Sequence, residues 1–274
     1  MNNSFIKCTL IMTKKVENIP TKIWQDNPSP DNPFVTETSI CHGYDVYGDL
    51  LENASFIDYL FLLFMGEAPT QAQKNLLESL AVALANPGPR DHSVRAAMNG
   101  GAGGSSNAAC LIAALGVGAG NLGGGHEVSI AMKIWQICGC DISKWEESLV
   151  NPPEDDREDV WNLIEHAPGF DPNAQSCSKP VLQTLEYLKQ FDVGTALNWL
   201  SENRIFLESI TDSSLAMSGV AAAAIHDLGL NDDQGEMLYL LLRLPGATVH
   251  AVERRQYGWR QYPFFGDKLK FKDK

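Results

Sequence analysis

Apolar residues recur three and four positions apart along most of this chain, the spacing that places them on one face of a helix. The first such pattern predicts a helix from Ser55 to Gly66, and Pro69 beyond it is a typical stop. Its apolar positions are Phe56, Tyr59, Leu60, Leu63 and Phe64. Thr70 is suited to cap the next helix, which is expected to end near Pro87. The residues expected on its inner face are Leu76, Leu77, Leu80, Val82 and Leu84.

Further helical patterns follow, and no long alternating run that would mark a strand accompanies them. These stretches are 127–137, 181–189, 195–204, 213–228 and 232–244. Residues 1–36 are predicted to form an arm, because prolines exclude a continuous helix or a central strand there. Residues 151–180 also carry prolines and are expected to form loops and short helices. The pattern as a whole predicts an all-α protein.

Composition and charge narrow the function classes. Of the 274 residues, 44% are hydrophobic, which is ordinary for a globular protein and argues against intrinsic disorder. The formal net charge of -13 disfavours nucleic acid and anionic membranes, because phosphate binding requires concentrated Lys and Arg. The apolar run Cys8–Met12 is too short to span a membrane and lacks the layout of a secretory signal. We therefore expect a cytoplasmic protein with no nucleic-acid or membrane partner.

Two familiar motifs are incomplete in this chain. Residues 118–123 match G-x-G-x-x-G, but residues 105–115 before them predict a helix, whereas a dinucleotide-binding fingerprint follows a strand. His126 and Glu127 begin H-E-x-x-H, yet Ile130 stands in place of the second histidine, so a zinc site lacks its ligand pair. We expect no metal and no tightly bound cofactor.

The glycine run before His126 leaves two interpretations open. Gly123, Gly124 and Gly125 could allow helices to pack tightly at a turn. Alternatively, Gly124 and Gly125 could let a ligand approach the backbone N–H groups at the start of the next helix, where carboxylates and phosphates are favoured.

An arginine cluster near the C-terminus also has two interpretations. Arg254, Arg255 and Arg260 are interleaved with Tyr257 and Trp259. They could form surface ion pairs. They could also form an anion site, completed across a subunit interface, because the guanidinium fork matches carboxylate and phosphate geometry.

Four segments, taken in order, resemble the citrate synthase superfamily, and especially its short citryl-CoA lyase type. They are residues 48–70, which end Gly66-Glu67-x-Pro69-Thr70; residues 102–125, which end Gly120-Asn121-Leu122-Gly123-Gly124-Gly125; residues 219–230, which begin Gly219-Val220-Ala221-Ala222; and residues 243–260, which include Arg243-Leu244-Pro245-Gly246 and His250-Ala251-x-Glu253. The second resembles the helix pair before the family's His-Gly-Gly-Ala motif, and the third resembles the segment after its Asn-Val-Asp-Gly motif.

The resemblance implies a fold, an assembly and a ligand class. It implies a large helical domain of residues 37–137 and 211–274, with a small lid domain inserted at 138–210. It also implies a homodimer with the site between the domains, and a coenzyme A thioester and a small carboxylate as ligands. In the family, an aspartate removes a proton from an acyl-CoA thioester, one histidine stabilises the enolate, and a second polarises the keto group of the partner acid.

This chain departs from the family at each of these positions. The first histidine falls on Gly123, the second falls on Pro172, and the aspartate falls on Ser218. A neutral serine is too weak a base for this proton, and proline donates no hydrogen bond. Nearby residues that could substitute are His126, His166 and Asp212.

Three hypotheses about function follow. The chain could be a citryl-CoA lyase-like or citrate synthase-like enzyme with a non-canonical active site. It could be a catalytically silent relative that binds coenzyme A, a carboxylate or a regulatory partner. It could also use the same fold for different chemistry, with His126 or Ser218 as the catalytic candidates. In each case Gly124, Gly125, Arg255 and Arg260 are the candidates for substrate binding, and Arg260 matches the family's carboxylate-binding arginine best.

Overall fold

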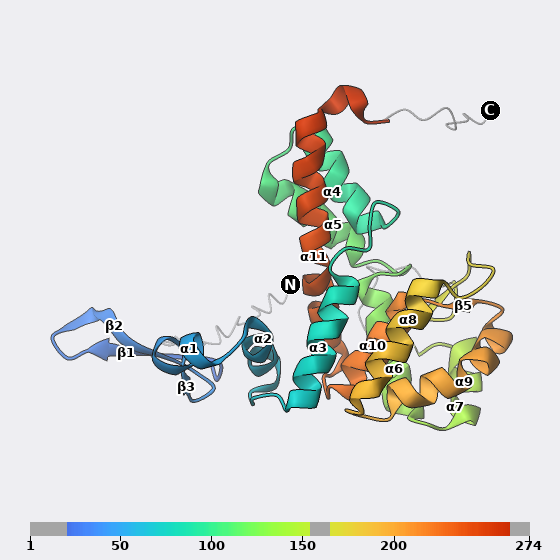
Figure 1. The fold of residues 1–274 in the computed structure, drawn as a ribbon, viewed down its shortest axis with the longest axis horizontal. Helices are drawn as coiled ribbons and strands as arrows, with labels where there is room; N and C mark the ends of the chain where they lie inside the picture. The colour runs from blue at the N-terminus through green and yellow to red at the C-terminus, as the bar shows by residue number, and fades with distance from the viewer. Residues whose placement is uncertain (1–20, 154–164, 264–274) are drawn as a thin grey trace, which may run out of the picture. The chain divides into compact units, whose positions relative to one another are not determined.

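The computed structural model describes residues 21–153 and 165–263 (Figure 1). The chain divides into two compact units, Met1–Ser55 and Phe56–Lys274. Helices make up most of the second unit, which confirms the predicted all-α class. The predicted division of the chain into an arm, a large domain and a lid stays a prediction.

The first unit contains a β-hairpin. Strand β1 (Trp24–Ser29) pairs antiparallel with β2 (Asn32–Cys41), which also pairs with the short β3 (Tyr44–Asp45). A π-helical turn η1 and the short helix α1 follow, at Val46–Leu50 and Leu51–Asn53. The expectation of no long strand is therefore wrong. Pro28 lies where the register between β1 and β2 shifts, and Pro33 lies near the turn, so neither removes a bond from a regular ladder.

The second unit is built from ten helices within the described residues. They are α2 (Phe56–Met65), α3 (Gln71–Leu84), α4 (His92–Ala102), α5 (Asn107–Gly118), α6 (Gly125–Cys138), α7 (Ile142–Val150), α8 (Lys179–Leu188), α9 (Ala196–Thr211), α10 (Met217–Asp227) and α11 (Asp232–Tyr257). Short 3-10 turns η2 and η3 occupy Lys189–Phe191 and Trp259–Gln261. Two short strands, β4 (Phe170–Asp171) and β5 (Ser214–Leu215), pair antiparallel.

Local sequence explains where several helices begin and end. Thr70 caps α3 in a reciprocal capping box with Gln73, as its position predicts. Helix α11 continues past the predicted end at Leu244, although Pro245 lies inside it. The N–H of Gly246 donates to the carbonyl of Ala85 at the end of α3 (2.7 Å), so a tertiary contact satisfies this donor.

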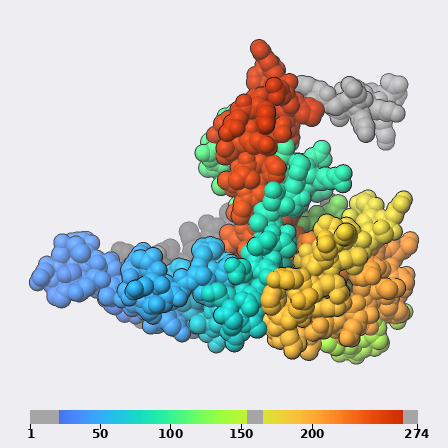
Figure 2. Space-filling view, in the orientation of Figure 1, coloured from blue at the N-terminus to red at the C-terminus, as the bar shows by residue number. Residues whose placement is uncertain are grey.

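Two clusters of buried apolar residues hold the second unit together. The larger is centred on α6 and α10 and includes Leu238 and Leu242 of α11. The smaller joins α4 and α5 to Ala247 and Ala251 of α11. Val82 does not face inward as predicted, because its side chain is 76% exposed on the surface of α3. Figure 2 shows α3 beside α8 on this face of the second unit.

Candidate functional site

A pocket of about 490 Å³ opens beside the glycine run. We call it the Gly123 pocket. Its walls come from the loop before α4, the loop before α6, the loop around β4 and the segment before α10. Among its lining residues are Arg90, Asp91, His92, Leu122, Gly123, Glu127, Phe170, Asp171, Ser178 and Ala216. Its volume is typical of a small-molecule site.

The Glu127 carboxylate connects three walls of this pocket. Its Oε1 accepts hydrogen bonds from Ser218 Oγ (2.6 Å) and from the N–H of Gly169 (2.9 Å). Its Oε2 accepts from the N–H of Gly123 (2.5 Å) and lies 3.3 Å from His166 Nε2. Glu127 is only 1% exposed. A carboxylate has about four acceptor positions, and here each oxygen has two partners.

This arrangement brings together the segments in which the sequence resemblance places the family's chemical motifs. Gly123 and Ser218 are two of the positions that the resemblance aligns with family residues, and Gly169 lies three residues before Pro172, the third. All three segments meet at Glu127, although they are far apart in the chain. Of the proposed substitutes, His166 reaches this point. Asp212 instead ends α9 in a left-handed conformation and is not among the residues that line the pocket.

The peptide of Gly123 is also held from its carbonyl side. Tyr239 Oη (3.0 Å) and Arg243 Nη1 (2.8 Å) both donate to the Gly123 carbonyl. The buried Arg243 guanidinium forms an ion pair with the partly buried Asp91, whose side chain also caps the first turn of α4. Burial raises the pKa of Tyr239 to about 12, so its hydroxyl stays protonated and remains a donor at physiological pH. Sequence reasoning missed this network, since the pairing of Asp91 with Arg243 spans 152 positions.

The three glycines have different surroundings. A Cβ on Gly124 would lie 2.1 Å from the carbonyl oxygen of Gly120, and a Cβ on Gly125 would lie 3.0 Å from Leu240 Cγ. Both glycines are buried, and neither is among the pocket-lining residues. Their surroundings match the tight-packing interpretation. Gly123 has a φ of +64°, and a Cβ there would have no heavy atom within 4 Å.

The other predicted site residues lie around or away from the pocket. His126 is 2% exposed on α6, and its backbone N–H donates to the Ala119 carbonyl (3.3 Å). Ser218 is 1% exposed and reaches the pocket only through its bond to Glu127. Pro172 is exposed and follows Asp171, which lines the pocket.

The predicted arginines do not line the pocket. Arg255 donates from Nη1 to Asn107 Oδ1 (2.7 Å) and from Nη2 to the carbonyl of Ser105 (2.6 Å), which binds α11 to the loop before α5. The guanidinium of Arg260 lies 5.3 Å from the centre of the Trp259 ring. A different cation, Arg90, lines the pocket, and its side chain forms no hydrogen bond or ion pair with the residues that the structure describes.

Other kinds of site find no support in the described residues. Helix α5 precedes the G-x-G-x-x-G run, so the sequence context of a Rossmann fingerprint is absent there. Within residues 21–153 and 165–263, no group of three His, Cys, Asp or Glu side chains could hold a metal ion. None of the helices in these ranges combines the length and the apolar character that crossing a membrane requires.

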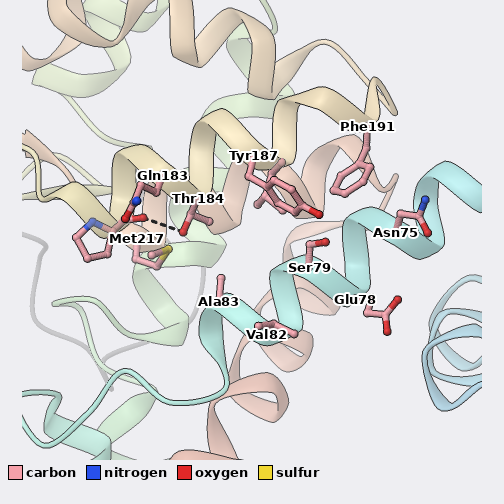
Figure 3. Close-up of a pocket in the computed structure, with 12 residues that line it drawn as sticks. Asn75, Glu78, Ser79, Val82, Ala83, Gln183, Thr184, Tyr187, Phe191 and Met217 are labelled. Carbon is pink, nitrogen blue, oxygen red and sulfur yellow. Dashed lines mark hydrogen bonds between the residues drawn. The ribbon is translucent and has the colours of Figure 1, made fainter.

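A larger pocket of about 850 Å³ lies between α3 and α8 (Figure 3). Figure 3 shows Tyr187 and Phe191 along one side and Ser79 and Val82 of α3 on the other. Among the described residues that line it, Glu78 is the only charged one. This lining suits an anionic ligand poorly, and no predicted site residue belongs to it.

Comparison with known proteins bears on the fold. No family model and no curated protein matches this chain. The structure of citryl-CoA lyase from Hydrogenobacter thermophilus matches with a TM-score of 0.72 and 18% identity, over 93% of this chain and 95% of that one. ATP citrate lyase from Methanothrix soehngenii, in complex with citrate and coenzyme A, matches with a TM-score of 0.72 and 15% identity. That match covers 96% of this chain but only 43% of the lyase.

Citrate synthase from Thermotoga maritima matches less closely, with a TM-score of 0.58, 17% identity and coverage of 80% of this chain and 59% of that one. Together these likenesses show that the chain has the citrate synthase fold, as the resemblance in its sequence implied.

Proposed function

We propose that this protein binds a small carboxylate, free or as a coenzyme A thioester, in the Gly123 pocket. The fold supports this proposal, because a solved relative with the same fold holds citrate and coenzyme A. The pocket supports it as well. Arg90 and His92 line its wall, and Arg90 has no partner among the described residues. An arginine without an ion pair is a favourable group for a carboxylate.

We further propose that cleavage of citryl-CoA here is far slower than in ordinary family members, or absent. The observation that carries this proposal is the set of contacts around Glu127. A general base needs a free lone pair directed at the proton it removes. Glu127 is the carboxylate where the family positions meet, and its oxygens already accept hydrogen bonds from Ser218, Gly169 and Gly123. This geometry favours the catalytically silent alternative.

One observation favours the enzyme hypothesis as a second candidate. His166 Nε2 lies 3.3 Å from Glu127 Oε2, so a carboxylate and an imidazole lie together beside positions that the resemblance aligns with the family's acid and base. Ordered in this way, His166 could exchange a proton with a ligand while Glu127 orients its ring. Glu127 and His166 would then replace the absent family residues.

Titration with ligands and an activity assay separate these two candidates. We expect heat of binding from citrate and from acetyl-CoA, and little release of oxaloacetate from citryl-CoA. Arg90→Gln should weaken citrate binding by about tenfold, the effect of losing one charge-assisted contact. Arg95→Gln is the matched control, because Arg95 is exposed on α4, the helix that follows Arg90, and is not among the pocket-lining residues.

The outcomes are distinct. Absence of binding heat for every ligand at millimolar concentration would refute the binding proposal. Rapid cleavage of citryl-CoA that is lost in His166→Gln would establish the second candidate. If rapid cleavage were lost in His126→Ala instead, the catalytic group would be His126, and its side chain would have to turn toward the pocket.

Assembly and location are also proposals. We propose a homodimer in the cytoplasm, in which the exposed Arg255 or Arg260 of one copy could approach the site of the other, and a lid at 138–210. The exposed positions of both arginines are compatible with this role. Light scattering of the purified chain would test the dimer. A monomeric mass at micromolar concentration would exclude it.

A further inference from the structure

Gly123 leaves unfilled space in the wall of the pocket. A Cβ at this position would have no heavy atom within 4 Å beyond its neighbours in the chain, and Gly123 is one of the lining residues. Gly124 and Gly125 differ, since a Cβ on Gly124 would clash with the Gly120 carbonyl oxygen and a Cβ on Gly125 would crowd the Leu240 and Glu236 side chains. The φ of +64° favours glycine, yet Asn, Asp and His also adopt this conformation. Packing therefore does not require position 123 to lack a side chain.

The wall that carries this space is fixed in place. The Gly123 N–H is bonded to Glu127, and the Gly123 carbonyl accepts from Tyr239 and Arg243. Glu127 lies on α6, and Tyr239 and Arg243 lie on α11, so two helices hold the Gly123 loop. Because the peptide groups on both sides of Gly123 are held by these bonds, an inward movement of the loop that closes the space would have to break them. A ligand group can therefore occupy it.

The neighbouring lining residues indicate what this group is. Leu122 and Phe170 are apolar and line the same pocket as Gly123. Arg90 lines it as well and provides a cationic group in the wall. A ligand that matches both parts carries a negative charge at one end and an apolar substituent at the other. Apolar surface removed from water on Leu122, which is 42% exposed, would add to its affinity.

We infer that the Gly123 pocket selects carboxylates that bear an apolar branch or ring, with this group against Gly123 and the carboxylate toward Arg90. The inference rests on the proposed function and narrows its ligand class. In this respect Gly123 determines specificity, because any side chain at position 123 would occupy the space that the branch or ring requires.

Pyruvate and phenylpyruvate test the inference directly, since they share the carboxylate and the keto group and differ by one phenyl ring. We expect wild-type protein to bind phenylpyruvate at least about tenfold more tightly in calorimetry. Gly123→Asn should abolish this preference by weakening the binding of phenylpyruvate more than that of pyruvate, and Gly123→Ala should reduce the preference partly. The matched control is Gly104→Asn, because Gly104 has a φ of +80°, has open space around a Cβ and is not a lining residue.

The result can fail in two separable ways. If pyruvate binds and phenylpyruvate binds no better, or if Gly123→Asn weakens both equally while Gly104→Asn weakens neither, the inference is wrong and the proposed function stands. If neither acid, citrate nor acetyl-CoA binds to folded protein, the proposed function fails and the inference fails with it. Thermal unfolding of each variant confirms that binding is compared between folded proteins, and Gly123→Ala decides the matter if Gly123→Asn does not fold.

Discussion

Replacing Glu127 by glutamine should destabilise the second unit strongly, although the two side chains have almost the same shape. The substitution turns one of the two carboxylate oxygens into an NH₂ group, which cannot accept a hydrogen bond. Oε1 now serves Ser218 and Gly169, and Oε2 serves Gly123. Whichever oxygen is retained, one backbone N–H faces another donor.

The expected cost follows from these contacts. A buried donor left without an acceptor costs about 1–3 kcal/mol. The remaining bonds lose their charge assistance, which roughly doubles the strength of a hydrogen bond. Because Glu127 is 1% exposed, water cannot replace the missing partner. We expect a total of about 3 kcal/mol, which is a fall in Tm of about 6–12 °C for a unit of this size.

Thermal unfolding followed by circular dichroism measures this loss. Glu146→Gln is the matched control, because Glu146 is exposed on α7 and should change Tm by less than about 2 °C. A double-mutant cycle with Ser218→Ala adds a second readout, with an expected coupling of at least about 0.5 kcal/mol. Glu127 would not connect the pocket walls as described if Glu127→Gln had the same Tm as Glu146→Gln. The same conclusion would follow if the free-energy changes of Glu127→Gln and Ser218→Ala were additive.

Three further predictions concern contacts outside that carboxylate. Arg243→Met should lower the free energy of unfolding in urea by about 3 kcal/mol, because it leaves Asp91 without its ion-pair partner and removes one of the two donors to the Gly123 carbonyl. Burial lowers the pKa of His226 below its ordinary value, so the unfolded chain binds more protons than the folded one. The free energy of unfolding should therefore fall as the pH drops below about 6.5, and it should fall less in His226→Gln. Thr70→Ala should cost about 1 kcal/mol in the same urea assay, since it removes one half of the capping box.

Each of these has a contrary outcome. An Arg243→Met protein as stable as wild type would show that Asp91 finds another partner or is readily hydrated. If stability had the same pH dependence in wild type and His226→Gln, other groups would cause the loss of stability in acid. Asp227, next to His226, has a pKa that burial raises above its ordinary value. Its contribution to stability therefore has the opposite pH dependence: it stabilises the folded protein at low pH, and this stabilisation is lost as the pH rises through the pKa of Asp227 in the folded protein.

Much of the fold could be predicted from the sequence because helical periodicity and end signals act locally. The helix ending at Gly66, the cap at Thr70 and the helical character of the stretch before the G-x-G-x-x-G run all depend on residues close together in the chain. The hairpin of β1 and β2 was missed because the prolines in this stretch were taken to exclude strands. In the structure Pro28 and Pro33 lie where regular strand pairing breaks down or begins, so they do not interrupt it. The extension of α11 beyond Pro245 was also missed, because the N–H of Gly246 is satisfied by the Ala85 carbonyl, a contact far away in the sequence.

The site was less predictable, for a physical reason. The sequence indicated Gly123 and Ser218 as positions that had lost a function, and the structure places both beside Glu127. The importance of Glu127 arises only when three segments far apart in the chain converge on its oxygens: the loop before α6, the loop before β4 and the first turn of α10. No spacing or periodicity encodes such convergence. Arg90 was missed for the same reason, because it becomes informative only through its place in a pocket wall.

Helix α11 belongs to both clusters of buried apolar residues, and Pro245 stands between the stretch that serves one and the stretch that serves the other. The smaller cluster consists largely of alanines and buries little apolar surface per residue, so it should open at a lower free energy than the larger one. Heating or mild denaturant should then release α4, α5 and the last turns of α11 as one cooperative step, while α6 and α10 stay protected from hydrogen exchange. The two parts of the continuous helix α11, on either side of Pro245, would thereby unfold in two separate transitions.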